Sequence, residues 1–207
     1  ALTTEQERRL WALRHAASPI LASLPPDRRS LQVIEDGCVP LPRLGDYARA
    51  IREAATECGI TVVIFGHAGD GHLHVNALPE LARPDWVERV ERLYRAVNAA
   101  AIRLGGTVSG EHGDGRLRAP LLEQLYGPEL VGLFRRVKAA FDPHGIFNPG
   151  VKLGGASPIR HLKLGPDAAA IDEDIALGLR DIEQSGGYAR SRLALAQSGP
   201  GTPLPAR

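Results

Sequence analysis

The stretch Ile60-Thr-Val-Val-Ile-Phe-Gly-His-Ala-Gly-Asp-Gly-His-Leu-His-Val-Asn-Ala-Leu78 decides the fold of this chain. Its first part, residues 60–65, is a run rich in β-branched side chains, which is typical of a strand buried on both faces. A glycine-rich turn follows at residues 66–71, and the pattern predicts a second strand at residues 72–78. The two strands therefore belong to a small antiparallel or mixed sheet.

Helical patterns lie on both sides of this pair of strands. Apolar residues recur at helical spacing in five segments: 3–24, 44–58, 83–104, 120–126 and 129–141. Thr3 or Thr4 is expected to cap the first helix, and Gly59 to end the second. A further short strand is predicted at residues 31–35. This order of elements predicts an α+β fold with a small antiparallel sheet covered by helices.

The composition describes an ordinary globular chain. Its 207 residues are 43% hydrophobic, enough to bury the core of one domain with an additional tail. A net charge of +1 gives no sign of binding to nucleic acid or to an anionic membrane. Two cysteines are too few for a disulfide framework or an iron–sulfur cluster. No apolar run is long enough to span a bilayer, so we expect a cytoplasmic protein.

The character of the sequence changes after Leu153. Glycine and proline are frequent at residues 154–166, one helix is predicted at 168–184, and the last dozen residues are expected to be disordered. We therefore divide the chain into a domain at residues 1–153 and a linker or tail at 154–207. The chain contains no Met, and we expect it to be a piece of a longer protein.

Two glycine-rich segments, residues 66–76 and 109–116, carry the candidate chemistry. They contain four of the seven histidines, namely His67, His72, His74 and His112. Imidazole and carboxylate together suit zinc or a similar divalent metal, and glycine lets the backbone aim such side chains inward. The same residues taken singly are more often ordinary turn and surface residues.

Two chemical interpretations of these segments compete. One is a metal centre of two histidines and a carboxylate, with a spare base beside it. The other is a nucleotide hydrolase of the histidine-triad type, suggested by His72 and His74, but Asn76 stands where a third histidine is needed. No Gly-Lys-Ser/Thr follows the Gly-Asp-Gly turns, so they do not match a phosphate loop.

Three motifs in order give the chain a family resemblance. They are Gly66-His67…Gly69-Asp70-Gly71…His74…Asn76, then Ser109-Gly110-Glu111-His112-Gly113…Gly115, then Phe141-Asp142-Pro143…Phe147-Asn148-Pro149-Gly150. Over residues 5–153 the chain resembles the C-terminal domain of FAD-linked oxidases of the vanillyl-alcohol-oxidase type. That family includes D-lactate dehydrogenase, the glycolate oxidase flavin subunit and D-2-hydroxyglutarate dehydrogenase. The resemblance implies a ferredoxin-like cap domain with a C-terminal extension.

The resemblance also implies a reaction, the oxidation of a D-2-hydroxy acid with hydride transfer to FAD. A divalent metal, usually zinc in this family, would be held by His67, His74 and Glu111. His112 would be the general base that takes the hydroxyl proton. Asn148 would lie near the flavin, and Arg14 would bind the substrate carboxylate.

Several positions depart from the family pattern. His72 stands where the family often has Asn, so it is either a group that supports the metal ligands or an alternative ligand. Ile34 replaces a substrate-binding Lys of some 2-hydroxyglutarate enzymes. Residues 113–118 most resemble large bacterial forms in which an iron–sulfur domain follows, and residues 154–207 would then lead towards that domain.

The family binds FAD mainly through an N-terminal domain of about two hundred residues, the scale of one domain. Nothing before Gly66 resembles such a domain, so we expect the isolated chain to be inactive. The alternative function is a non-catalytic docking module, with a vestigial metal site, between flavin and electron-transfer domains. A metal-dependent hydrolase is a third hypothesis. In the full protein, electron-transfer partners could also bring the chain to the inner membrane as a peripheral component.

Overall fold

A computed structural model describes residues 3–22, 24–25, 27–34, 36–157, 159, 162, 164 and 170–185. The chain divides into two compact units, residues 1–166 and 167–207. The boundary predicted between residues 153 and 154 stays a prediction, although Ile159 beyond it is buried in the core of the first unit. No helix among the described residues has the length and apolar character that crossing a membrane requires.

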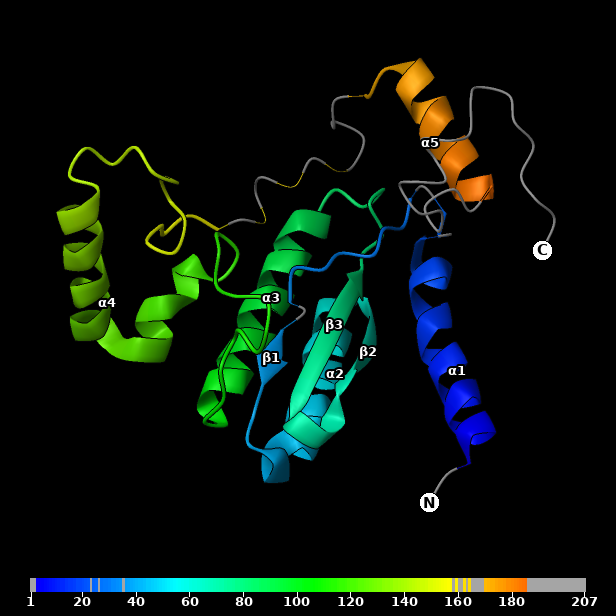
Figure 1. Cartoon of the computed structure of the whole chain (residues 1–207), viewed down its shortest axis with the longest axis horizontal. Helices are drawn as coiled ribbons and strands as arrows, with labels where there is room; N and C mark the ends of the chain where they lie inside the picture. Colours follow the sequence, from blue (N-terminus) through cyan, green and yellow to red (C-terminus); the bar gives the residue numbers. More distant parts are fainter. Residues whose placement is uncertain are drawn as a thin grey trace. The chain divides into compact units, whose positions relative to one another are not determined.

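The first unit is built around an antiparallel sheet of three strands (Figure 1). The strands are β1 (Gly37–Cys38), β2 (Thr61–His67) and β3 (His72–Leu78), in the order β1-β3-β2. β2 and β3 form a hairpin in which Val63 pairs with Asn76 and His67 pairs with His72. Together with the helices, this sheet confirms the predicted α+β class.

The helices of this unit are α1 (Thr4–Ala22), α2 (Leu44–Cys58), α3 (Trp86–Arg103) and α4 (Leu122–Phe141). Short 3-10 turns stand at η1 (Leu41–Arg43), η2 (Ala68–Asp70) and η3 (Ala119–Leu121). α2 and α3 pack against each other, and both contribute to one apolar core with Val75 and Ala77 of β3. The second unit contains the helix α5 (Glu173–Ser185).

The helix ends follow local chemistry. The Thr3 hydroxyl accepts a hydrogen bond from the Gln6 backbone N–H, and the Gln6 side chain accepts one from the Thr3 N–H, which together make a capping box. Gly59 ends α2 in the left-handed conformation, with φ 59°, as predicted. Gly127 has φ 80° and ψ 159°, so α4 consists of two helical segments around a kink, in agreement with the two helices predicted there.

Three sequence predictions are wrong in detail. In the strand predicted at residues 31–35, the described residues 31–34 form no strand: Leu31 exchanges two backbone hydrogen bonds with Ala77, and the chain then bends at the buried residues Val33 and Ile34. β2 is only half-buried because it is the edge strand, while β3 in the centre is buried on both faces. In the tail helix predicted at 168–184, residues 170–172 are not helical and the helix begins at Glu173, while 168 and 169 lie outside the described residues. The end predicted to be disordered lies outside the described residues.

Beyond α3 the chain returns to the sheet at Thr107. The backbone N–H of Thr107 donates to the Cys38 carbonyl at 2.7 Å, and the Cys38 N–H donates to the Thr107 carbonyl at 3.0 Å. Thr107 therefore lies on the side of β1 opposite β3. A ferredoxin-like sheet would have a fourth strand next to β1, on the side where Thr107 lies. Among the described residues, this position holds only the single bridge between Cys38 and Thr107. The ferredoxin-like description stays a prediction.

Candidate active site

Strand β3 separates polar from apolar side chains. All seven of its residues are buried. Because strand side chains alternate between faces, Leu73, Val75 and Ala77 point into the apolar core while three polar side chains point to the opposite face. These three are His72, His74 and Asn76. The rings of His72 and His74 lie 4.5 Å apart between centroids, so the strand places two imidazoles next to each other.

The hairpin turn brings a third imidazole to this face. Gly66 has φ 153°, and a Cβ atom at this position would lie 2.4 Å from the His72 carbonyl oxygen, so only glycine fits. His67 follows directly at the end of β2. Its ring stacks on that of His72 at 5.5 Å and meets that of His74 edge-on at 5.6 Å.

A turn after α3 adds a carboxylate and a fourth imidazole. The Glu111 carboxylate lies 3.2 Å from His74 Nε2 and 3.7 Å from His67 Nε2. The same carboxylate lies 3.3 Å from Nε2 of the adjacent His112, whose ring stacks on His74. The structure therefore brings together all four residues predicted to bind the metal or act as base: His67, His74, Glu111 and His112.

The geometry of this group fits a divalent cation. One ligand atom from each of His67, His72, His74 and Glu111 lies within 4.8 Å of the others. Ligand atoms that each lie about 2.0–2.2 Å from one zinc ion are separated from one another by less than this 4.8 Å limit. Small side-chain movements that bring these atoms closer together would therefore complete a site. Nitrogen and carboxylate donors suit zinc, iron or manganese. Which cation is bound remains part of the proposal below.

Behind this group lies Asp36, which sequence reasoning missed. His72 Nε2 lies 2.9 Å from Asp36 Oδ1, and both side chains are buried. The Asp36 carboxylate also accepts hydrogen bonds from the Glu111 and His112 backbone N–H groups and from the Ser109 hydroxyl. Nothing in the sequence near Asp36 marks it, because its partners are 36 to 76 residues away.

Asp36 is charged in spite of its burial. Burial alone would raise the pKa of this carboxyl, but the N–H groups of His112 and Glu111 and the guanidinium of Arg118 hold it below its ordinary value. Arg118 Nη2 lies 3.7 Å from Asp36 Oδ2. Arg118 is itself held by the carbonyls of Val108 and Gly113, at 3.0 Å each.

The two remaining predicted residues lie outside this group. The Arg14 guanidinium of α1 lies 4.3 Å from the centre of the Phe65 ring, and that ring lies 5.4 Å from the ring of His74. Asn148, with φ 45°, lines an apolar hollow of about 640 Å³ beside α4. Its loop reaches the Gly113–Gly115 turn through the Lys152 N–H, which donates to the Gly115 carbonyl at 2.8 Å.

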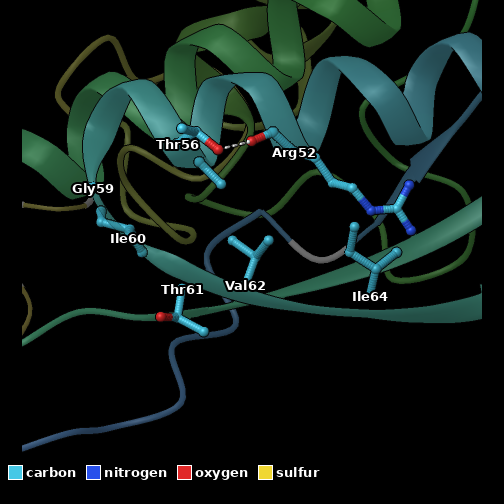
Figure 2. A pocket seen from close by; sticks show the side chains of 8 residues that line it. Arg52, Thr56, Gly59, Ile60, Thr61, Val62 and Ile64 are labelled. Carbon is cyan, nitrogen blue, oxygen red and sulfur yellow. Dashed lines mark hydrogen bonds between the residues drawn. The ribbon is translucent and has the colours of Figure 1, made fainter.

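Neither the hollow beside α4 nor a second hollow is lined by the imidazoles. Figure 2 shows the other one, of about 660 Å³, between α2 and the edge strand β2. It is lined by Arg52, Ala55, Thr56, Gly59, Ile60, Thr61, Val62 and Ile64. The four imidazoles lie instead where the interior meets the surface: His72 and His74 are buried, while the side chains of His67 and Glu111 are 52% and 44% exposed.

Comparison with known proteins gives a consistent result. Residues 1–151 match the family model for the C-terminal domain of FAD linked oxidases. The chain is 39% identical over 150 residues to the glycolate oxidase subunit GlcD of Bacillus subtilis, covering 72% of this chain and 31% of that protein. It is 37% identical over 123 residues to D-lactate dehydrogenase of Archaeoglobus fulgidus, covering 59% and 27%.

A third relative is D-2-hydroxyglutarate dehydrogenase of Escherichia coli, 34% identical over 142 residues, which cover 69% of this chain and 14% of the relative. The chain therefore matches less than a third of the length of each of these three relatives.

Proposed function

Because this chain belongs to the FAD linked oxidases through their C-terminal domain, we propose that it caps the substrate in a flavoprotein that oxidises a D-2-hydroxy acid. The product would be the 2-oxo acid, with the hydride passing to FAD. The named relatives act on glycolate, D-lactate and D-2-hydroxyglutarate, which supports a small substrate of this class. The observation that carries the proposal is the Glu111 carboxylate, which contacts His67, His74 and His112 at once.

Each residue then has a role in the reaction. A divalent cation held by His67, His74 and Glu111 would lower the pKa of the substrate hydroxyl and fix its orientation. His112 would accept the hydroxyl proton of the substrate. FAD, held mainly by another part of the polypeptide, would supply the acceptor for the hydride from the carbon that bears this hydroxyl. The half-buried Arg14 would bind the substrate carboxylate, and the exposed Asn148 would face the flavin.

The flavin requires another part of the polypeptide, for which the structure offers an apolar surface. Leu130, Leu133, Val137 and Phe141 recur every three or four residues along α4 and are 38%, 44%, 59% and 84% exposed. Ile146 and Phe147, just before Asn148, are exposed as well. Apolar surfaces of this kind are typical of interfaces. We infer that an N-terminal FAD-binding domain covers this surface.

Residues 113–118 resemble family members in which an iron–sulfur domain follows, and this resemblance suggests how the full protein is organised. Residues 154–207 would connect to such a domain, and the protein would act in the cytoplasm, free or attached peripherally to the inner membrane. Without the flavin domain, the isolated chain is expected to give no turnover with a D-2-hydroxy acid and a dye acceptor.

Elemental analysis of the purified chain tests the metal site. Wild type should contain about one equivalent of zinc, iron or manganese per chain, as three protein ligands with an open position would hold it. His74→Ala should lose this metal, and His144→Ala should retain it because the exposed His144 lies in a separate turn. Absence of metal from wild type, even after loading with excess zinc, would contradict the proposal.

A second candidate function is the docking module. The exposed apolar face of α4 is the observation that favours it, since docking needs this surface but no chemistry. A full-length protein that loses turnover on substitution of His112, with its metal retained, would exclude this alternative.

A further inference from the structure

The turn that carries Glu111 and His112 has no regular secondary structure of its own. It lies between Gly110 and Gly113, and Gly113 has φ 76°. Glycine on both sides leaves such a segment many backbone conformations. The side chains of Glu111 and His112 are therefore placed accurately only if something outside the turn fixes its backbone.

Asp36 provides this fixation. Three successive backbone N–H groups of the turn donate to this one residue. The Gly110 N–H donates to the Asp36 carbonyl at 2.8 Å, and those of Glu111 and His112 donate to the carboxylate at 3.1 and 3.0 Å. Hydrogen bonds to a charged acceptor are about twice as strong as those between neutral groups.

The same carboxylate reaches strand β3, which carries His74, another of the three proposed metal ligands. His72 Nε2 donates to Asp36 Oδ1, because a carboxylate only accepts, and the Ser109 hydroxyl donates to Oδ2 at 3.2 Å. Oδ1 thus receives donors from His72 and Glu111, and Oδ2 from Ser109 and His112, with the Glu111 N–H shared between both oxygens, which fills the capacity of a carboxylate. Asp36 is therefore fully engaged by the protein, as a residue behind the ligands rather than a ligand.

We propose that Asp36 is the positioning residue of the site, fixing the Glu111–His112 turn against strand β3. This inference rests on the proposed function, because it assigns Asp36 a part in holding the metal. Groups behind a metal site orient its ligands, and their substitution weakens metal affinity about 10- to 100-fold.

Asp36→Asn tests the proposal on the 207-residue chain. The substitution keeps the shape but presents an NH2 group, a donor, where one oxygen accepts. We expect the dissociation constants for Zn²⁺ and Mn²⁺, measured by calorimetry, to rise at least about 10-fold. In NMR spectra of the metal-free chain, the amide signals of Glu111 and His112 should also shift.

The matched control is Asp142→Asn. Asp142 is a second buried aspartate that accepts two backbone N–H groups, those of Ile146 and Phe147, and its ion pair is with Lys138. This variant should lose comparable stability yet bind metal as wild type does. If Asp36→Asn fails to fold, Ser109→Ala removes a single donor to the same carboxylate and should weaken metal binding in the same direction.

The possible outcomes separate the inference from the function on which it rests. Metal binding by wild type with equal affinity in Asp36→Asn would overturn the positioning role and leave the proposed function intact. If wild type binds no metal, the proposed metal site fails. The amide signals then decide whether Asp36 holds the turn: unchanged signals would refute it, and shifts confined to residues 109–113 would support it.

Discussion

The hydroxyl of Tyr47 lies directly against the backbone of Gly37: a Cβ atom built on Gly37 would be 2.0 Å from this oxygen. Tyr47 belongs to α2 and is fully buried, so its ring is packed on all sides and cannot move away from Gly37. Strand β1, which begins directly after Asp36, therefore passes over the end of this side chain.

Gly37→Ala should consequently destabilise the chain. Overpacking of a rigid core costs about 1–3 kcal/mol, and the free energy of unfolding in urea should fall by this amount. In a Tyr47→Phe background the cost should be smaller, because the hydroxyl is gone, although the ring carbon Cζ would still lie 2.7 Å away. An identical cost in both backgrounds would show that the two residues do not meet in this way.

Asp142 should make stability depend on pH in the acid range. The Lys138 side chain, together with the Ile146 and Phe147 N–H groups and against the effect of burial, holds the pKa of Asp142 below its ordinary value. A lowered carboxyl pKa stabilises the fold fully above the unfolded value of about 3.9, and this contribution disappears as pH falls through the folded value. Melting temperatures of wild type and Asp142→Asn between pH 2 and 7 should therefore converge below about pH 4. A constant difference would contradict this account.

Asn148 allows its backbone and side-chain roles to be separated. Its φ of 45° lies in the left-handed region, where residues other than Gly, Asn and Asp lose about 1–2 kcal/mol. Asn148→Ala should lower the stability of the chain by about 1 kcal/mol, whereas Asn148→Gly should not. In the full-length protein, a loss of bound flavin by the stable glycine variant would assign that effect to the side chain, and unchanged flavin content would remove Asn148 from the cofactor site.

His112→Ala should affect turnover far more than folding. A general base typically contributes about 10²–10⁴-fold, so the kcat of the full-length enzyme should fall by that factor. Metal content should persist, because His67, His74 and Glu111 are unchanged. His144→Ala serves as the control for loss of an exposed imidazole. Retention of more than about a tenth of wild-type turnover would require another base.

The elements that sequence predicted well are those determined by neighbouring residues. The β2–β3 hairpin follows from β-branched runs around a glycine-rich turn, and the break at Gly127 from the adjacent Pro128. Burial of β2 was predicted wrongly because the composition of a strand does not state whether it lies at the edge or in the centre of a sheet. The strand predicted at residues 31–35 failed for the same reason. Its pairing depends on a distant residue, Ala77, which follows Leu31 by 46 residues.

In the candidate site, too, the residues that belong to local motifs were predicted, and a residue defined by distant contacts was not. His67, His74, Glu111 and His112 belong to two short motifs that are visible in the sequence, and the fold brings these motifs together. Their assignments as ligands and base stay predictions. The role of Asp36 could not be predicted from the sequence. An aspartate outside any motif is identified only by its contacts, and here they come from Gly110, Glu111 and His112 in another part of the chain.

Strand β3 has a consequence for how this domain can vary. His72, His74 and Asn76 carry polar side chains on one face, and Leu73, Val75 and Ala77 fill the core on the other, so both sets depend on one register with β2. A single inserted or deleted residue at the hairpin would exchange the two sets and turn two imidazoles and an amide into the apolar interior. Homologues of this domain should therefore differ here by replacement of residues, while changes in length accumulate in other loops.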